Sequence, residues 1–470
     1  FGSRAVWLKM WTDDAYCIGI GHCFPSHLES TVVAVNGLDR DDKDGALLLH
    51  FDVNKTVILT DSIDMRTQDE CIREGVSELF WGLLTDHEQV GLAWFWLGEK
   101  TTGSLAPDGA DRHIVTYADF CKLKLKDKKE RKLAMRNFSL VKSVDAKKKM
   151  EEYVASAMKQ MQLEPKDQKS MEEAGLRGNT LMMLPALFRL VATLQKKKQK
   201  FAIVFRSFGK DHEKIRKEWN AFCEMRHPLF KSLLKSIGPL DGSKPGVPDR
   251  RLYRIHTLYR DVDGPVLALD TFTNGPEHAP WDDWAKQKPR PATDTRGGRD
   301  FLQNQLKAMT LEGTSELQRW FESNLREEKT VAIKDDWAWW TWHDEASECG
   351  KLMCVAEPSL MRQLFFDDNV DHGEPHIVDV RKSDGSTMPK EQVMQRVITK
   401  VNAVEALMDD NYFIQAVLRC HNLKLDIPSR KISLDDDVRK PLGFASFLMC
   451  RGCGTKEDEI TDRQDSRCCD

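Results

Sequence analysis

An apolar run near residue 50 predicts a buried parallel strand. Residues 46–51 are apolar except for His50, Gly45 precedes them, and Asp52 ends them. Runs of this length without alternation are typical of strands covered on both faces. Polar residues follow the aspartate, among them Asn54 two positions later. The same residues also fit an ordinary strand followed by an Asp/Asn turn, so the rest of the chain has to decide between the two interpretations.

Two later apolar runs also end in polar residues and predict further buried strands. Residues 201–207 end in Ser207, and residues 363–369 carry Asp367 and Asp368 near their end. Strands that alternate with helical segments are typical of a parallel α/β sheet. Other strands are predicted at residues 251–259 and 265–272, which would form a hairpin, and at residues 376–380.

The spacing of apolar residues predicts helices in several other parts of the chain. Between residues 66 and 195 the pattern is mainly helical, and in residues 69–84 apolar positions recur every three or four residues. Asp211 is a good N-cap for a helix over residues 213–225. Further helices are predicted at residues 150–161, 181–195, 300–311, 315–325, 391–407 and 412–420.

Two segments have an unusual composition. Residues 122–149 hold 12 Lys or Arg against three acids, which predicts a solvated helical face. A patch for an anionic substrate or nucleic acid is the alternative. Residues 337–342 contain four tryptophans, a cluster typical of an anchor in a core or an interface. The alternative there is a stacking platform for a ring-bearing ligand.

Length and composition set broad limits on function. The 470 residues suit two to four domains or one core with large insertions, and 41% hydrophobic residues suffice for such a core. The formal net charge is −4, which argues against a nucleic-acid binder as a whole. No apolar stretch approaches the roughly 18 residues of a membrane span, so a soluble protein is expected. Because the chain begins with Phe1, we expect an incomplete amino terminus and can infer nothing about a targeting peptide.

The 12 cysteines are mostly scattered singly among apolar residues. This pattern predicts reduced thiols rather than a disulfide framework. The polar segment over residues 427–470 contains Cys450 and Cys453, followed by Cys468 and Cys469. Their spacing is compatible with a zinc site, and a tail with chance cysteines is the alternative. The chain shows no internal repeat and no glycine-rich phosphate loop.

Four features together indicate phosphoryl-transfer chemistry. Asp52, Ser207 and the pair Asp367 and Asp368 end predicted parallel strands, whose carboxyl ends meet at one edge of a sheet. Lys351 precedes the acidic pair. Carboxylates can act as a nucleophile and hold Mg²⁺, while a hydroxyl and an ammonium can neutralise charge on the transferring group.

In these features the sequence resembles the haloacid-dehalogenase-like superfamily of phosphatases and phosphotransferases. The first motif of that family, a buried strand and then Asp-x-Asp-x-Thr/Val, is similar to residues 52–56. The second, a strand ending in Ser or Thr, is matched by Ser207. The third is a lysine, best matched by Lys351, with Lys334 as the second choice. The fourth is a strand and an acidic pair, matched by residues 367–368. The resemblance covers well under half of the chain.

The resemblance implies a role for each matched residue. Asp52 would form an aspartyl-phosphate, and the phosphate would be held by Ser207, Lys351 and Thr56. The metal ligands that it implies for Mg²⁺ are Asp52, the backbone carbonyl of Asn54, Asp368 and, in an assisting role, Asp367. One departure concerns catalysis directly. The family's phosphatases usually carry an Asp two positions after the nucleophile as general acid and base, and Asn54 cannot exchange a proton as a carboxyl does.

The resemblance also implies an organisation of the chain. We expect an α/β, Rossmann-like core with a mainly helical cap at residues 66–195 and a second, α+β insertion at residues 238–329. The core pieces would be residues 1–65, which include the N-terminal segment, 196–237 and 330–426, and the polar cysteine-containing tail would be residues 427–470.

The function expected from these observations is that of a Mg²⁺-dependent phosphohydrolase or phosphotransferase in the cytoplasm. Its substrate would be a phosphorylated small molecule or phosphoprotein, and neither nucleic acid nor a membrane is expected as a partner. Because position 54 is an asparagine, activity is expected to be weak. One alternative is a catalytically inert binding or scaffold protein with the same core. Another is a phosphate- or nucleic-acid-binding module that uses residues 122–149.

Overall fold

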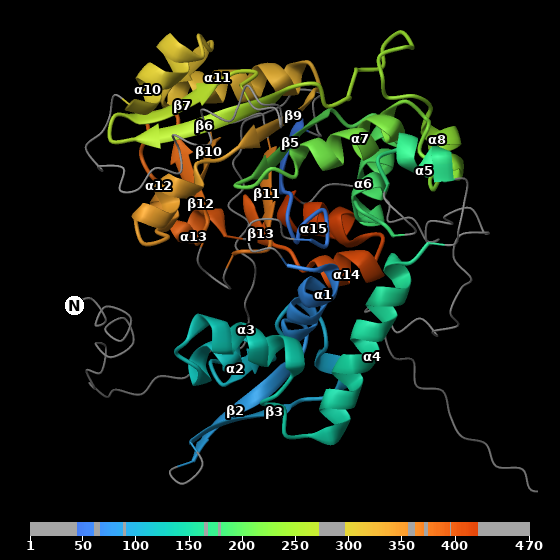
Figure 1. Ribbon diagram of the computed structural model, residues 1–470, viewed down its shortest axis with the longest axis vertical. Helices are drawn as coiled ribbons and strands as arrows, with labels where there is room; N and C mark the ends of the chain where they lie inside the picture. Colours follow the sequence, from blue (N-terminus) through green and yellow to red (C-terminus); the bar gives the residue numbers. More distant parts are fainter. Residues whose placement is uncertain are drawn as a thin grey trace, which may run out of the picture. The chain divides into compact units, whose positions relative to one another are not determined.

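The structure is a computed structural model of the 470-residue chain, shown in Figure 1. It describes residues 45–60, 66–87, 91–163, 168–176, 180–271, 297–355, 362–370, 375–394 and 396–421. The cysteines of the tail, for which a zinc site was one interpretation, lie outside these ranges.

The fold is organised around an eight-stranded sheet in which the first six strands of the sheet order pair in parallel, while β7 pairs antiparallel with both of its neighbours, β6 and β8. The predicted α/β class with a mostly parallel sheet is therefore confirmed. The predicted hairpin forms as well, and it extends this sheet. In sheet order the strands are β13 (Ile398–Lys400), β11 (Arg362–Asp367), β1 (Leu47–Asp52), β5 (Phe201–Ser207), β9 (Thr330–Lys334), β6 (Ile255–Asp261), β7 (Gly264–Ala268) and β8 (Thr310–Glu312).

Both faces of the central strands are buried, as their unbroken apolar composition predicts. On one face, Phe51 of β1 stacks on Phe366 of β11 and meets Phe413 edge-on. On the other face, Leu48 belongs to a second apolar cluster that includes Phe321. The helices that supply these layers are α6 (Pro185–Lys196), α7 (His212–Cys223) and α15 (Tyr412–His421) on the first face, and α11 (Gly313–Arg326) on the second.

The order of the strands places a topological switch point between β1 and β11. From β1 the chain continues to β5 and β9 on one side, whereas the later strands β11 and β13 lie on the other side of β1. The connections therefore diverge at the carboxyl ends of β1 and β11, which is where open α/β sheets bind their ligands. Asp52 and Asp367 are the last residues of these two strands.

The strands β10 (Lys351–Val355) and β12 (Val378–Lys382) form a second, small parallel sheet, and Leu352 and Cys354 of β10 pack in the same apolar cluster as Leu48 of the central sheet. β12 corresponds to the strand predicted at residues 376–380, shifted by two residues, while β10 was not predicted. Helix α12 (Trp337–Trp342) contributes Trp339 and Trp340 to the apolar cluster around this sheet. These two tryptophans act as core anchors, in agreement with the first interpretation of the tryptophan cluster.

The segment 66–195 is mainly helical, as predicted, but it also contains a three-stranded antiparallel sheet. The helix predicted over residues 69–84 is wrong beyond Ser77, because residues 81–87 pair with strands on both sides. Local apolar spacing cannot reveal this long-range pairing. The elements are α1 (Gln68–Ser77), β2 (Trp81–His87), β3 (Gly91–Trp96), η1 (Glu99–Thr101), β4 (Ile114–Thr116), α2 (Tyr117–Lys124), α3 (Lys128–Asn137), α4 (Val144–Met161), α5 (Gln168–Glu173) and α6.

The basic segment 122–149 spans the end of α2, all of α3 and the start of α4. Many of its lysines are exposed, which agrees with a solvated helical face. Among the basic residues of the segment, Arg136 pairs with Glu70 and Glu74 of α1, and Lys149 pairs with Glu99 and Glu152.

Two other predicted helices are wrong in extent. Residues 391–407 form α13 (Lys390–Val393), β13 and α14 (Ala403–Met408) instead of one helix. The β-branched residues at 397–401 favour a strand, and Asn402 then caps α14 by accepting bonds from the amides of Val404 and Glu405. Residues 300–311 form only the short helical pieces α10 (Gly297–Asp300) and η3 (Phe301–Gln305) before β8 begins. The remaining elements of the described ranges are α8 (Lys231–Ile237) and η4 (Ser347–Cys349).

The six cysteines within the described ranges are all thiols, and five of them are buried, as the scattered pattern predicts. None of the helices in the described part of the chain has the length and apolar character that crossing a bilayer requires.

Candidate functional site

The site is centred on an ammonium group held between two buried carboxylates. Lys351 Nζ lies 2.5 Å from Asp52 Oδ1 and 2.7 Å from Asp367 Oδ2. Register pairing places the two aspartates on the same face at the ends of neighbouring strands. Lys351 reaches them from the first position of β10, outside the central sheet. All three side chains are at most 7% exposed, so water screens their charges little.

The electrostatics of this group follow from burial and from the neighbouring charges. Burial raises the pKa of Asp52 well above its usual range. The ammonium of Lys351 opposes that rise, while the carboxylates of Asp367 and Asp368 add to it. Burial, together with the charge of Asp368, also raises the pKa of Asp367. Burial alone would lower the pKa of Lys351, but the two adjacent carboxylates raise it instead. Lys351 is therefore a fixed positive charge.

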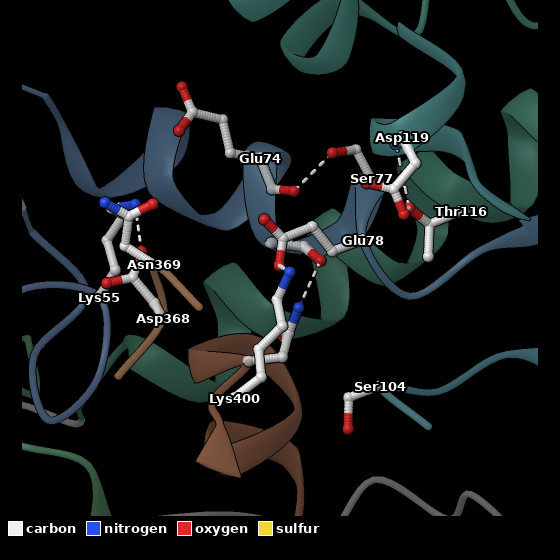
Figure 2. A network of polar contacts seen from close by, with 12 residues as sticks. Lys55, Glu74, Ser77, Glu78, Ser104, Thr116, Asp119, Asp368, Asn369 and Lys400 are labelled. Carbon is white, nitrogen blue, oxygen red and sulfur yellow. Dashed lines mark hydrogen bonds and ion pairs between the residues drawn. The ribbon is translucent and has the colours of Figure 1, made fainter. Parts of the chain in front are cut away.

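A second lysine neutralises the third carboxylate. Lys55 donates a hydrogen bond to Asp368 Oδ2 and forms an ion pair with it, as Figure 2 shows. Lys55 follows Asn54 directly and has a left-handed backbone (φ 53°), a conformation typical of tight turns. The backbone amide of Asp368 donates to Thr56 Oγ1 at 3.1 Å. The turn after β1 thus holds Asp368 through the ammonium of Lys55 and the hydroxyl of Thr56.

The amide of Asn54 lies between a hydroxyl and another carboxylate. Ser207 Oγ donates to Asn54 Oδ1 at 3.0 Å, and Asn54 Nδ2 donates to Asp211 Oδ2 at 2.7 Å. Ser207 Oγ also accepts a bond from the amide of Gly209 at 2.9 Å. Asp211 stands directly before α7, as predicted for an N-cap, but its side chain makes no capping bond to that helix. Its carboxylate faces Asn54 instead, and the predicted capping role is therefore wrong.

Backbone contacts hold Lys351 in place. Its amide donates to Ile377 O at 2.7 Å. The preceding Gly350 lies so close to Ile377 that an added Cβ would be 2.2 Å from that carbonyl oxygen. Arg260 donates to the carbonyl of Gly350 at 2.8 Å and pairs with the buried Asp379. The start of β10 is therefore fixed from both sides, and with it the position from which the lysine side chain extends.

The side chain of Lys351 also lies near an aromatic pair. Its Nζ is 5.2 Å from the ring centroid of Phe208, which in turn stacks on Trp340 at 5.4 Å. A contact of this kind between an ammonium and an aromatic ring is favourable. The tryptophan cluster thus borders the site through Phe208.

The structure brings together most of the residues that the sequence indicated. Asp52, Lys351, Asp367 and Asp368 form one connected group, and Asn54 and Ser207 form an adjoining one. Of the two candidate lysines, Lys351 is the one between the carboxylates. Lys334 ends β9 in register with Ser207. Together with burial, which is the larger effect, its charge lowers the pKa of His212 to about 3.

Sequence reasoning missed two residues of the site. Lys55 lies inside the motif at residues 52–56. A lysine in a site otherwise predicted to gather carboxylates indicates an ion pair with one of them, and this was the available signal. Asp211 lies four residues after Ser207, in the turn that follows the same strand. An acid in that turn can cap the helix, but it can equally bond a polar side chain at the carboxyl edge of the sheet.

The carboxylates offer a donor set for a metal ion. Asp52, Asp367 and Asp368 each contribute one oxygen, and these atoms lie within 4.8 Å of one another. Oxygen ligands of this kind suit hard divalent cations such as Mg²⁺. The donor set fits such an ion. Lys55 and Lys351 balance two of the three negative charges.

Comparison with known proteins gives no relative: no family, no curated protein and no solved structure matches this chain.

Proposed function

We propose that this protein is a metal-dependent phosphoryl-transfer enzyme that forms an aspartyl-phosphate on Asp52. The observation that carries the proposal is the bridge that Lys351 makes between Asp52 and Asp367 at the divergence of β1 and β11. A carboxylate, an ammonium and further acids at such a place are the groups that phosphoryl transfer requires. The resemblance of the sequence motifs to haloacid-dehalogenase-like phosphatases and phosphotransferases supports the same conclusion.

In the proposed reaction an oxygen of Asp52 attacks the phosphorus atom of the substrate. A new bond forms between that oxygen and phosphorus, and the bond to the leaving oxygen breaks, so that the leaving group departs with its electron pair. Lys351 stabilises the negative charge on the transferring group, because its ammonium is already oriented at Asp52. Ser207 is held by the amide of Gly209, which fixes the position of its hydroxyl.

Asp367 and Asp368, together with Asp52, would hold Mg²⁺. When bound there, Mg²⁺ would supply positive charge that offsets the negative charge of the phosphoryl group. Lys55 would have to release Asp368, at least in part, for that carboxylate to reach the metal. Asn54 cannot serve as a general acid, so substrates with good leaving groups, such as aryl or acyl phosphates, are expected to react best.

The test is a phosphoenzyme assay on the full chain with para-nitrophenyl phosphate and millimolar Mg²⁺. Wild type should release a burst of nitrophenol of about one equivalent and then a slow steady state. Asp52→Asn should abolish the burst and the steady state. The matched control is Asp86→Asn, which changes an exposed aspartate of β2 and should behave as wild type. Activity that survives Asp52→Asn would refute the mechanism.

A second candidate function is a catalytically inert phosphate-binding protein with the same core. It is favoured by the pairing of the acidic cluster with two lysines and by the engagement of both ends of the Asn54 amide. Wild type that binds inorganic phosphate but shows neither burst nor turnover with the aryl phosphate would support this candidate over the first.

A further inference from the structure

We propose that Asp211 is a positioning residue that fixes the Asn54 amide in one orientation, so that the site retains a phosphoryl group on Asp52 instead of releasing it to water. This inference rests on the proposed function and adds to it a reason for slow release. It concerns the pair Asn54 and Asp211, whose side chains are separated by 157 positions in the sequence.

The orientation of Asn54 follows from the chemistry of its partners. An ionised carboxylate can only accept hydrogen bonds, so the atom of Asn54 that lies 2.7 Å from Asp211 Oδ2 must be the NH₂ group. The carbonyl oxygen of the amide then faces Ser207, whose hydroxyl donates to it at 3.0 Å. A flip of the amide would place an oxygen against an oxygen and an NH₂ against the hydroxyl.

Burial makes this arrangement costly to break. Asp211 and Ser207 are fully buried, and Asn54 is 6% exposed. When a buried polar group loses its hydrogen-bond partner, the free-energy cost of its desolvation is no longer compensated. Lys214 pairs with the other oxygen of Asp211 from the surface of α7, so the carboxylate is held from both sides.

The same bonds keep Asn54 and Ser207 from acting as the base in hydrolysis. Hydrolysis of the aspartyl-phosphate requires a water oxygen to attack phosphorus while the bond from phosphorus to Asp52 breaks, and one proton of the water must pass to a base. Asn54 is no base, and the hydroxyl proton of Ser207 points at Asn54. With the proposed arrangement, phosphoryl transfer to Asp52 can occur while transfer onward to water is slow.

An aspartate at position 54 is incompatible with Asp211 for the same reason. In Asn54→Asp a carboxylate oxygen would replace the NH₂ group 2.7 Å from Asp211, and the two negative charges would repel each other in a buried place. Exchanging both residues restores the complementarity, since the amide introduced at position 211 could donate to the carboxylate introduced at position 54. The exchange also supplies a carboxyl at the position where the phosphatases of the resembling family carry their general acid and base.

The experiment is a double-mutant cycle in the full chain with Asn54→Asp, Asp211→Asn and the exchanged pair. Thermal unfolding should show a loss of several degrees in Tm for Asn54→Asp, and adding Asp211→Asn should restore most of that loss. The same Asp211→Asn change should not raise the Tm of the wild type. This non-additivity is the mark of a direct interaction.

The matched control for the cycle is Asp127→Asn. Asp127 also stands directly before a helix, where its carboxylate accepts from the amides of Lys129 and Glu130. Combined with Asn54→Asp it should add no rescue. If Asn54→Asp does not fold at all, a folded exchanged pair is itself the rescue. A cycle in which Asp211→Asn has the same effect in both backgrounds would overturn the inference.

The second arm measures the lifetime of the phosphoenzyme formed from para-nitrophenyl phosphate with Mg²⁺. The exchanged pair should shorten that lifetime and raise the steady-state rate at least tenfold, because general acid–base catalysis is typically worth about 10²–10⁴-fold. A rescued Tm with an unchanged lifetime would make Asp211 merely structural and would overturn the positioning role. Absence of a phosphoenzyme in every variant would refute the proposed function, and with it phosphoryl retention, while the cycle would still establish whether the two side chains pair.

Discussion

Lys351 donates to Asp52 across 299 positions of sequence, and the 2.5 Å contact between them lies almost entirely out of water. The same ammonium also donates a hydrogen bond to Asp367 Oδ2 at 2.7 Å. One ammonium therefore donates to two buried carboxylates that end adjacent strands. This relationship governs the stability of the site as well as its chemistry, because a buried charge without a partner is strongly destabilising.

Replacing Lys351 with methionine should destabilise the protein by about 3–5 kcal/mol, since Asp52 and Asp367 would lose their compensating charge. Chemical denaturation of wild type and variant measures the difference. Adding Asp52→Asn to the methionine variant should recover part of the lost stability, because one of the two unpaired buried carboxylates is then absent. A loss below about 1 kcal/mol, the range of exposed ion pairs, would contradict the buried geometry.

Asp52→Asn should not destabilise the metal-free protein and is expected to stabilise it by about 1–2 kcal/mol at pH 7, as replacement of a functional residue at a cost to activity often does. Burial raises the pKa of Asp52, so the folded state binds its proton more tightly than the unfolded chain. The ionised carboxylate of Asp52 therefore lowers the free energy of unfolding to its full extent above the folded-state pKa. This effect disappears as the pH falls toward the pKa of the unfolded chain. Denaturation at pH 7 and at pH 4 should show the gain shrinking. A gain that grows on acidification would contradict the sign of this pKa shift.

Lys55→Met should increase the affinity for Mg²⁺ by about tenfold, equivalent to about 1.4 kcal/mol. In wild type the cation has to displace the ammonium of Lys55 from Asp368, and in the variant it does not. The rise in Tm over a Mg²⁺ titration reports the affinity without any assay of activity. The matched control is Lys198→Met, which changes an exposed lysine with the same left-handed backbone, φ 53°. Equal titration curves for Lys55→Met and wild type would show that the lysine does not compete with the metal.

His256 should make the protein sensitive to acid. Burial, followed by the charge of Arg254, lowers the pKa of His256 to about 3, whereas the unfolded chain has the ordinary value of about 6.5. Between these values the unfolded state binds more protons, so stability falls as the pH drops below about 6.5. At pH 5 the loss from this residue is about 2 kcal/mol.

The measurement for His256 compares wild type with His256→Gln between pH 7.5 and pH 5. The glutamine can keep the bond that His256 Nδ1 accepts from the amide of Asp270, but it does not titrate. Exposed His113 supplies the control variant His113→Gln, which should lose stability as wild type does. The prediction fails if the glutamine variant at 256 is as acid-sensitive as wild type.

The sequence was most informative where strands are buried on both faces. Apolar runs that end in Asp52, Ser207 and Asp367 predicted three buried parallel strands, because strands covered on both faces consist almost entirely of apolar residues. The structure shows that these three strands are neighbours. The order of the strands then brings Asp52 and Asp367 to one edge of the sheet. The choice of Lys351 over Lys334 came from the resemblance of the motifs, since spacing alone does not show that β10 exists.

What the sequence could not show depends on pairing between distant segments. Residues 81–87 have helical spacing but become a strand because β3 and β4 lie beside them. The β-branched residues of β13 were hidden within a longer pattern of helical period. Asp211 looked like a helix cap, and only the position of Asn54 after the neighbouring strand shows where its carboxylate points.

The long separation between the halves of the site has a consequence for biosynthesis. β1 is a central strand, yet its neighbour β11 and the lysine that compensates Asp52 are encoded about 300 residues later. At ribosomal rates of 5–20 residues per second, one edge of β1 waits roughly 15–60 s for its partner. During that time an apolar strand with unpaired backbone groups invites aggregation. Binding by a chaperone early in synthesis would protect that edge, and any truncation of the chain before β11 would leave it permanently open.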